Sequence, residues 1–193
     1  AGVVRELTEG SVVLDCTFDI EPPKEPEMDL LLALPRPKIM KRLWSPLAAL
    51  GVRCIFLTNA AKVERNYFDT HWIESEYFEP LLLEGLAQAG DTRLPEVTVV
   101  RRLKPFVEDK LDGLAPDSLR LLAHPGAGNS MGSLKTTGKR MLLAVGPEGG
   151  WTDFELALLE AHKFQRISMG PRTLRTDHAC IALISVLRNM FIL

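Results

Sequence analysis

The sequence has few cysteines, and their placement favours neither a cross-link nor a metal site. Among 193 residues the three cysteines, Cys16, Cys54 and Cys180, lie far apart without a C-x-x-C spacing. The four histidines are also scattered and form no H-x-x-x-H pattern. A sparse and odd cysteine count argues for a reducing compartment and against a disulfide framework or a zinc site. We therefore expect no metal.

Long hydrophobic runs and a strong charge bias are also missing. No stretch approaches the ~18 uninterrupted apolar residues of a membrane-spanning helix, so we expect no membrane partner. The first residues have neither the basic start nor the apolar centre of a signal peptide. The default expectation is a cytoplasmic protein, and an organelle stays open because the sequence does not begin with methionine. A net charge of -2 neither demands nor excludes a nucleic-acid partner, since a local basic patch decides that.

Five apolar runs separated by helical patterns predict an α/β fold. Most of the runs are continuously hydrophobic rather than alternating, which is typical of strands covered on both faces. Strands that alternate with helices favour a mainly parallel sheet. The runs occupy residues 30–34, 52–58, 119–124, 141–145 and 164–169.

The segments between these runs predict helices. One begins at Pro37 and stops at Gly51, and another covers 71–89. We expect Pro46 to kink or interrupt the first helix and Pro80 to disturb the second. The sequence TDFE, residues 152–155, has the S/T-x-x-E form of a capping box, and an apolar stripe over 179–190 predicts a helix at the end of the chain.

The first 27 residues differ in character from the rest. Alternating apolar residues around Glu9 and Gly10 predict a small β-hairpin, and the segment EPPKEPE, 21–27, has the composition of a linker. We interpret residues 1–27 as the remnant of an N-terminal β module with its linker. Residues 28–193 then form the main domain.

Three loops of small residues each follow a predicted strand. They are HPGAGNS at 124–130, GPEGGWTDFE at 146–155 and GPRTLRTDHA at 170–179. Glycines allow close backbone approach and positive φ, and open α/β sheets bind ligands at the carboxyl ends of their strands. From its composition alone, the GPEGG loop is explained about equally well as a ligand-binding loop and as a tight connection between a strand and a helix. Two Gly-Pro loops after neighbouring strands favour one shared pocket, and neither a dinucleotide fingerprint nor a P-loop is present.

In this order the three loops closely resemble the RsmE family of SPOUT-superfamily methyltransferases. That family methylates N3 of a uridine in small-subunit (16S-type) ribosomal RNA. Two upstream segments, LPRPKIMKRLWSPLAALGV and EGLAQAGDTRLPEV, are also similar, so the resemblance covers roughly 28–193. It implies a C-terminal trefoil knot, a homodimer, a ribosomal RNA partner and S-adenosylmethionine as the methyl donor. It also implies that residues 1–27 hold a remnant of an N-terminal PUA-like β-barrel.

The resemblance assigns residues to three roles. The donor is expected to contact Leu122, His124, Pro125, Gly146, Pro147, Glu148, Gly149, Gly150, Met169, Gly170, Leu174, Arg175 and Thr176. Arg172 and Arg175 are candidates to stabilise a uridine anion, and Glu148 and Asp177 are candidates to accept its proton. Each carboxylate has a structural alternative, because Glu148 can fix its own loop and Asp177 can cap a helix. Candidate RNA contacts are Gln88 and Arg93, in a Gln…Arg-x-Pro element, and Lys62 and Arg65.

One departure from the family and several alternatives stay open. The family commonly has Glu where this chain has Asp177, and the shorter side chain suits a cap better than a finely placed base. Two other basic clusters, Lys38–Arg42 and Arg101–Lys104, are also places where RNA could bind, and a solvated helix face is the usual explanation of such a run. The alternatives are a SPOUT methyltransferase for another RNA and a catalytically silent RNA-binding assembly factor. A small-molecule α/β enzyme lacks any nucleophile–base pattern to support it.

Overall fold

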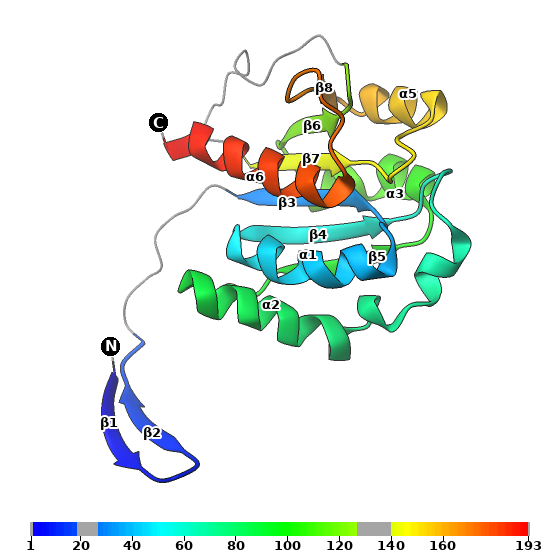
Figure 1. The fold of residues 1–193 in the computed structure, drawn as a ribbon. Coiled ribbons are helices and arrows are strands. Elements are labelled where there is room, and N and C mark those ends of the chain that lie inside the picture. Colours follow the sequence, from blue (N-terminus) through cyan, green and yellow to red (C-terminus); the bar gives the residue numbers. More distant parts are fainter. Residues whose placement is uncertain (1, 19–26, 127–139, 193) are drawn as a thin grey trace.

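The computed structural model describes residues 2–18, 27–126 and 140–192 (Figure 1). Its centre is a six-stranded sheet in the order β5-β4-β3-β7-β6-β8, and every neighbouring pair is parallel. The strands are β3 (Met28–Ala33), β4 (Val52–Thr58), β5 (Glu96–Val100), β6 (Leu119–Ala123), β7 (Met141–Val145) and β8 (Gln165–Ile167). The predicted α/β class with a mainly parallel sheet is confirmed.

Helices cover both faces of this sheet. The helices α1 (Pro37–Ala49), α2 (Ser75–Ala89) and α6 (Thr176–Ile192) lie on one face, and α3 (Leu103–Asp109) and α5 (Asp153–Ala161) lie on the other (Figure 1). Short turns at Arg65–Asp69, His71–Ile73 and Leu111–Leu114 complete the chain order. The inner strands β3 and β7 are buried along their whole length, as their continuous apolar sequences require.

Neither proline interrupts its helix, and a kink at Pro46 or a disturbance at Pro80 stays a prediction. Helix α1 runs through Pro46, and α2 runs through Pro80. Proline removes one helical hydrogen bond, but α1 and α2 bury apolar faces against the sheet and against each other, which offsets that loss. Helix α2 also begins later than predicted, at Ser75, after a 3₁₀ turn over 71–73.

Strand β5 and helix α3 were not predicted. The sequence EVTVV of β5 alternates and is largely exposed, since this strand is an edge of the sheet. Three other predictions are confirmed by the structure. The capping box of α5 is complete, a helix ends the described chain, and a hairpin forms from β1 (Gly2–Leu7) and β2 (Val12–Cys16).

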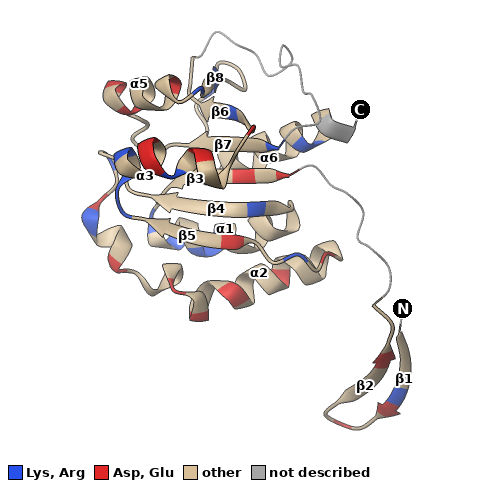
Figure 2. Cartoon of the chain, turned by 180° about the vertical axis from the view of Figure 1, so that it is seen from behind, with Lys and Arg blue, Asp and Glu red and all other residues tan. Residues whose placement is uncertain are grey.

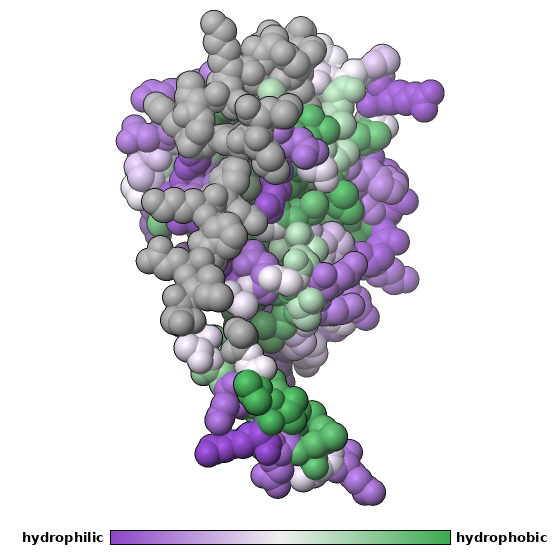
Figure 3. All heavy atoms as spheres, turned by 90° about the vertical axis from the view of Figure 1, so that its left-hand side faces the viewer, coloured by the Kyte–Doolittle hydropathy of each residue, from purple (hydrophilic) through white to green (hydrophobic). Residues whose placement is uncertain are grey.

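The hairpin carries its apolar side chains on the surface. Val3, Leu7 and Phe18 are among its exposed residues, and Figure 3 shows hydrophobic side chains gathered on this segment. The predicted linker over 21–27 lies almost entirely outside the described residues. Within the part of the chain that is described, no helix has the length and apolar character needed to cross a membrane.

The burial of two cysteines leads to a prediction about thiol reactivity. Burial raises the pKa of the Cys54 thiol to about 11 and that of Cys180 to about 12, whereas Cys16 is exposed. A thiol whose pKa lies well above the solution pH stays protonated and reacts slowly. At pH 8 we expect Ellman's reagent to label one thiol per chain at once, and all three in guanidinium. Rapid labelling of a second thiol in the native protein would contradict this burial.

Candidate functional site

A cavity of about 550 Å³ lies at the carboxyl ends of β6, β7 and β8, beside the start of α6. This volume falls within the usual range of small-molecule sites. Its walls come from the three loops singled out in the sequence, as far as they are described. Eleven of the predicted donor contacts line it: His124, Pro125, Gly146, Pro147, Glu148, Gly149, Gly150, Met169, Leu174, Arg175 and Thr176.

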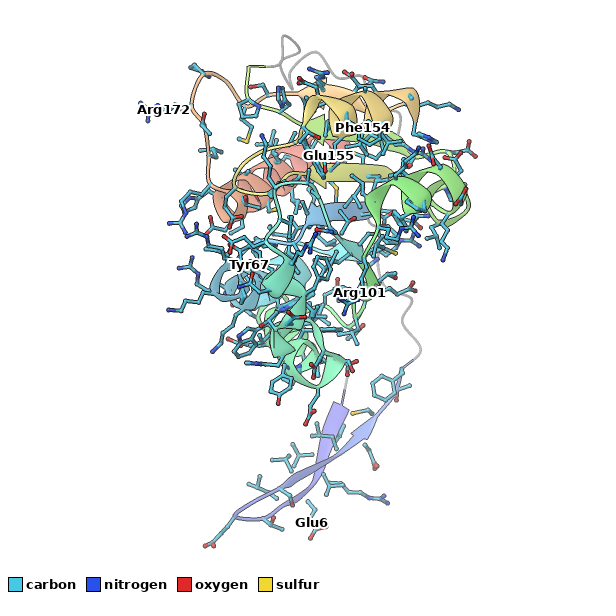
Figure 4. The ribbon with its side chains drawn as sticks, turned by 90° about the vertical axis from the view of Figure 1, so that its right-hand side faces the viewer. Glu6, Tyr67, Arg101, Phe154, Glu155 and Arg172 are labelled. Carbon is cyan, nitrogen blue, oxygen red and sulfur yellow. The ribbon has the colours of Figure 1, made fainter. Side chains whose placement is uncertain are left out.

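Three predicted residues lie outside the lining. Leu122 is buried inside β6, and Gly170 lies on the loop after β8 without facing the cavity. Asp177 also lies outside it, although its neighbours Arg175 and Thr176 line it. Arg172 lines the cavity from the outer loop between β8 and α6 (Figure 4). Residues 127–130, the end of the first predicted loop, are not described.

The loop after β7 is held in shape by contacts from distant parts of the chain. The Glu148 Oε1 atom accepts a hydrogen bond from the backbone N–H of Arg36 at 3.2 Å, which joins this loop to the end of β3. The Lys62 Nζ donates to the Gly149 carbonyl at 2.8 Å. Gly150 has φ +70°, a conformation that favours glycine. These contacts tie the loop to the N-cap of α1 and to the segment after β4.

Two charged residues outside the cavity lining, Asp177 and Arg36, interact with other side chains. Asp177 Oδ2 accepts from Arg42 at 3.2 Å, and its Oδ1 lies 3.6 Å from Arg175 Nε. Asp177 Oδ1 also accepts from the backbone N–H of His178, which suits a residue in the first turn of a helix. The pKa of Arg36 is raised, chiefly by its hydrogen bond to Tyr67 and also by Glu148.

Glu155, in the first turn of α5, connects the end of the loop after β7 to the segment after β4. It is buried, and its Oε2 accepts from the backbone N–H and the hydroxyl of Thr152, both at 2.8 Å, as in a capping box. Its Oε1 accepts from the N–H of Ala61 at 2.7 Å. One carboxylate therefore ties the segment after β4 to the start of α5.

Glu155→Gln is expected to lower the free energy of unfolding by about 2 kcal/mol. The side-chain NH₂ group of glutamine would face either the Ala61 N–H or the Thr152 donors, and that hydrogen bond would be lost. Guanidinium unfolding measures the change. Glu160→Gln, on the same helix, is the control, since Glu160 forms an exposed pair with Arg166 at 2.6 Å and should matter far less. Equal losses in the two variants would mean that the Ala61 contact contributes nothing.

The inner wall of the cavity is apolar. Val145, Ile167, Leu174 and Leu183 contribute side chains there. The indole N–H of Trp151 is buried beside Gly146 and has no hydrogen-bond partner among the described residues. Buried donors are normally paired, so this group marks a place where a ligand acceptor fits.

The predicted RNA contacts are not gathered in one place. Lys62 lines the cavity, whereas Arg65 lies in a neighbouring hollow. Arg93 contacts Asp91 through both of that carboxylate's oxygens, at 3.4 and 3.3 Å. Gln88 is exposed near the end of α2.

Sequence reasoning missed several lining residues. Ala179 and Leu183 line the cavity together with Thr176, and their positions i, i+3 and i+7 on α6 were a usable signal. Lys62 was assigned to RNA rather than to the Gly149 carbonyl, and no local pattern links two residues so far apart. Within the described residues no three His, Cys, Asp or Glu side chains gather where they could hold a metal ion.

Fold and cavity define a doubly wound α/β protein with a ligand site at the carboxyl edge of its sheet. Residues 22–188 match the RNA methyltransferase domain family, and the chain belongs to that family. It is 33% identical to the ribosomal RNA small subunit methyltransferase E of Treponema pallidum (strain Nichols), over 84% of this chain and 62% of that protein. The chain thus spans less than two thirds of this relative's length. The resemblance to the RsmE family is confirmed.

Solved structures agree on the fold. A Legionella pneumophila protein solved with bound cofactor SAM has a TM-score of 0.80 and 24% identity, covering 97% of this chain and 77% of its own. A ribosomal RNA small subunit methyltransferase E from Neisseria gonorrhoeae, bound to S-adenosyl methionine, has a TM-score of 0.76 and 20% identity, over 93% and 72%. At these identities the likeness concerns the fold alone.

Proposed function

We propose that this protein is an S-adenosylmethionine-dependent methyltransferase that modifies N3 of a uridine in small-subunit ribosomal RNA. The observation that carries the proposal is the cavity at the carboxyl ends of β6, β7 and β8. Two Gly-Pro loops and the described start of a third line it, and these loops carry the resemblance to RsmE sequences. The relative from Treponema pallidum bears the name ribosomal RNA small subunit methyltransferase E.

The donor fits the residues that are present. The apolar wall formed by Val145, Ile167 and Leu183 suits an adenosyl group, and the unpartnered N–H of Trp151 suits one of the donor's acceptors. The glycines of the 146–150 loop let a ligand approach the backbone closely. When bound, S-adenosylmethionine supplies a methyl group that its sulfonium already makes electrophilic.

The chain's own residues would align and deprotonate the base. Uridine N3 becomes nucleophilic once its weakly acidic proton leaves, so an enzyme must favour the anion. Arg172 and Arg175, exposed at the mouth of the cavity, are placed to stabilise that anion. Glu148 is the carboxylate that faces the cavity and is the better candidate for the proton acceptor. Asp177, which contacts Arg42 and lies outside the lining, positions Arg175.

The same proposal includes the finer features of the family. The sheet and α6 would form a SPOUT domain over 28–193 with a C-terminal trefoil knot. The exposed hairpin within 1–27 would be a remnant of a PUA-like β-barrel. The active protein would be a homodimer in the cytoplasm. Gln88, Arg93, Lys62 and Arg65 would contact RNA outside the donor cavity.

Titration calorimetry with S-adenosylhomocysteine, the product left by the donor, tests the proposed site. We expect micromolar binding with one molecule per chain. ATP, which shares only the adenosine part of this ligand, is the control and should bind far more weakly. A folded chain that binds no S-adenosylhomocysteine would refute the methyltransferase proposal and favour an RNA-binding assembly factor.

A further inference from the structure

A second hollow, of about 520 Å³, lies at the carboxyl ends of β4 and β5. Its lining includes Asn59, Arg65, Arg101, Arg102, Lys104 and Phe154. The segment between β4 and the turn at 65–69, the start of α3 and the start of α5 bring these residues together. Figure 4 looks onto this side, with Phe154 and Glu155 on α5 above Arg101.

The hollow has an excess of positive charge. Four of its lining side chains are basic and exposed, and its lining carboxylate, Glu155, already accepts hydrogen bonds from Ala61 and Thr152. Lys104 lies 3.7 Å from Glu108 in an exposed pair of the kind that contributes little. Figure 2 shows blue segments gathered beside α3, while α2 carries red ones along its length. This arrangement favours a polyanion over a neutral ligand.

Two further groups suit a nucleobase. The Phe154 side chain is 62% exposed beside the cations, which is unusual for an aromatic ring and leaves a face on which a base can stack. The Asn59 Oδ1 atom is buried and accepts no hydrogen bond from the described residues. An amide that lacks a partner can accept from the edge of a base.

The hollow adjoins the donor cavity. The segment 60–63 contributes Lys62 to the donor cavity and its neighbours Ala61 and Val63 to the hollow. In the same way Trp151 lines the cavity, whereas Thr152 lines the hollow. The Lys62–Gly149 hydrogen bond and the Glu155 contacts hold the wall between them. A single strand of RNA lying in the hollow therefore passes next to the donor cavity.

We propose that this hollow binds the single-stranded RNA that flanks the target nucleotide. Arg65, Arg101, Arg102 and Lys104 contact its phosphates, and Phe154 stacks on one base. The inference rests on the proposed function, since it takes RNA as the substrate. For the Arg101–Lys104 cluster, which the sequence left open between RNA contact and a solvated face, it favours RNA contact.

Fluorescence anisotropy with a labelled twelve-nucleotide oligouridine tests this, over a range of salt concentrations. We expect the double variant Arg101→Gln/Arg102→Gln to bind at least tenfold more weakly at low salt. The slope of log K against log salt should fall by about 1.4, or about 0.7 for each lost phosphate contact with a single strand. Phe154→Leu should weaken binding about fivefold without changing this slope.

The matched control is Lys110→Gln/Lys163→Gln, which removes the same charge. Both lysines are exposed and follow the C-terminal ends of α3 and α5, whereas the hollow is lined by the starts of these helices. Equal weakening in both double variants, or no oligouridine binding by the unmodified chain, would overturn the inference. Calorimetry with S-adenosylhomocysteine on the same variants separates the two proposals. If the Arg101→Gln/Arg102→Gln variant binds both S-adenosylhomocysteine and oligouridine as the unmodified chain does, only the RNA site in the hollow is refuted. If the unmodified chain does not bind S-adenosylhomocysteine, the proposed function is refuted.

Discussion

Ala179→Leu is expected to weaken S-adenosylhomocysteine binding about a hundredfold, equal to about 2.7 kcal/mol, while the protein stays folded. Ala179 lies on α6 between Thr176 and Leu183, and all three residues line the donor cavity. A leucine there adds three carbon atoms to a wall that a ligand must contact. Steric overfilling of a packed site typically costs 1–3 kcal/mol. Leucine is also a good helix former, so α6 itself should tolerate the change.

The control for this variant is Ala157→Leu. Ala157 is exposed on α5 and does not line the cavity, so binding should be unchanged. Calorimetry measures the dissociation constant of both variants, and circular dichroism reports whether they are folded. Unaltered binding by a folded Ala179→Leu protein would show that the ligand does not occupy this cavity.

Gly85→Ala is expected to destabilise the protein by about 1–3 kcal/mol, although alanine is the better helix former. Gly85 is buried where α2 crosses α1, and a Cβ atom there would lie 2.1 Å from the Ser45 carbonyl oxygen. Because the clash involves backbone, no side-chain rotation relieves it, and the two helices must separate. The adjoining ring contact of Trp44 with Phe78, at 4.8 Å between centroids, would be disturbed as well.

Gly113→Ala is the matched control. Gly113 lies in the short helical turn at 111–114, and a Cβ atom there would meet nothing within 4 Å. Guanidinium unfolding should show unchanged or slightly higher stability for this variant. If Gly85→Ala were as stable as Gly113→Ala, the close approach of α1 and α2 would be disproved.

The sequence predicted those parts of the fold that depend on local patterns. The apolar runs of β3, β4 and β7 needed cover on both faces, and TDFE contained both members of a capping box. Strand β5 was missed because an exposed edge strand need not be continuously apolar. Helices α1 and α2 continue through their prolines because intrinsic propensity is a weak signal once an amphipathic helix buries its apolar face.

For the site, the loops were identified but their internal contacts were not. Glycines and prolines after strands are visible in a sequence, and eleven of thirteen predicted donor contacts line one cavity. The pairing of Asp177 with Arg42 joins residues on different helices, and the bond from Ala61 to Glu155 joins the segment after β4 to helix α5. Such contacts arise from the order of strands in the sheet, which no local pattern encodes.

Nucleoside analysis of methylated RNA tests the central claim most directly. The chain is incubated with methyl-labelled S-adenosylmethionine and small-subunit ribosomal RNA that lacks N3-methyluridine, and the digested nucleosides are separated by mass spectrometry. The account predicts label in N3-methyluridine at one position, and much less label with the Ala179→Leu variant when the donor concentration is well below that variant's dissociation constant. Label in another nucleoside, or none at all from a chain that binds S-adenosylhomocysteine, would contradict it.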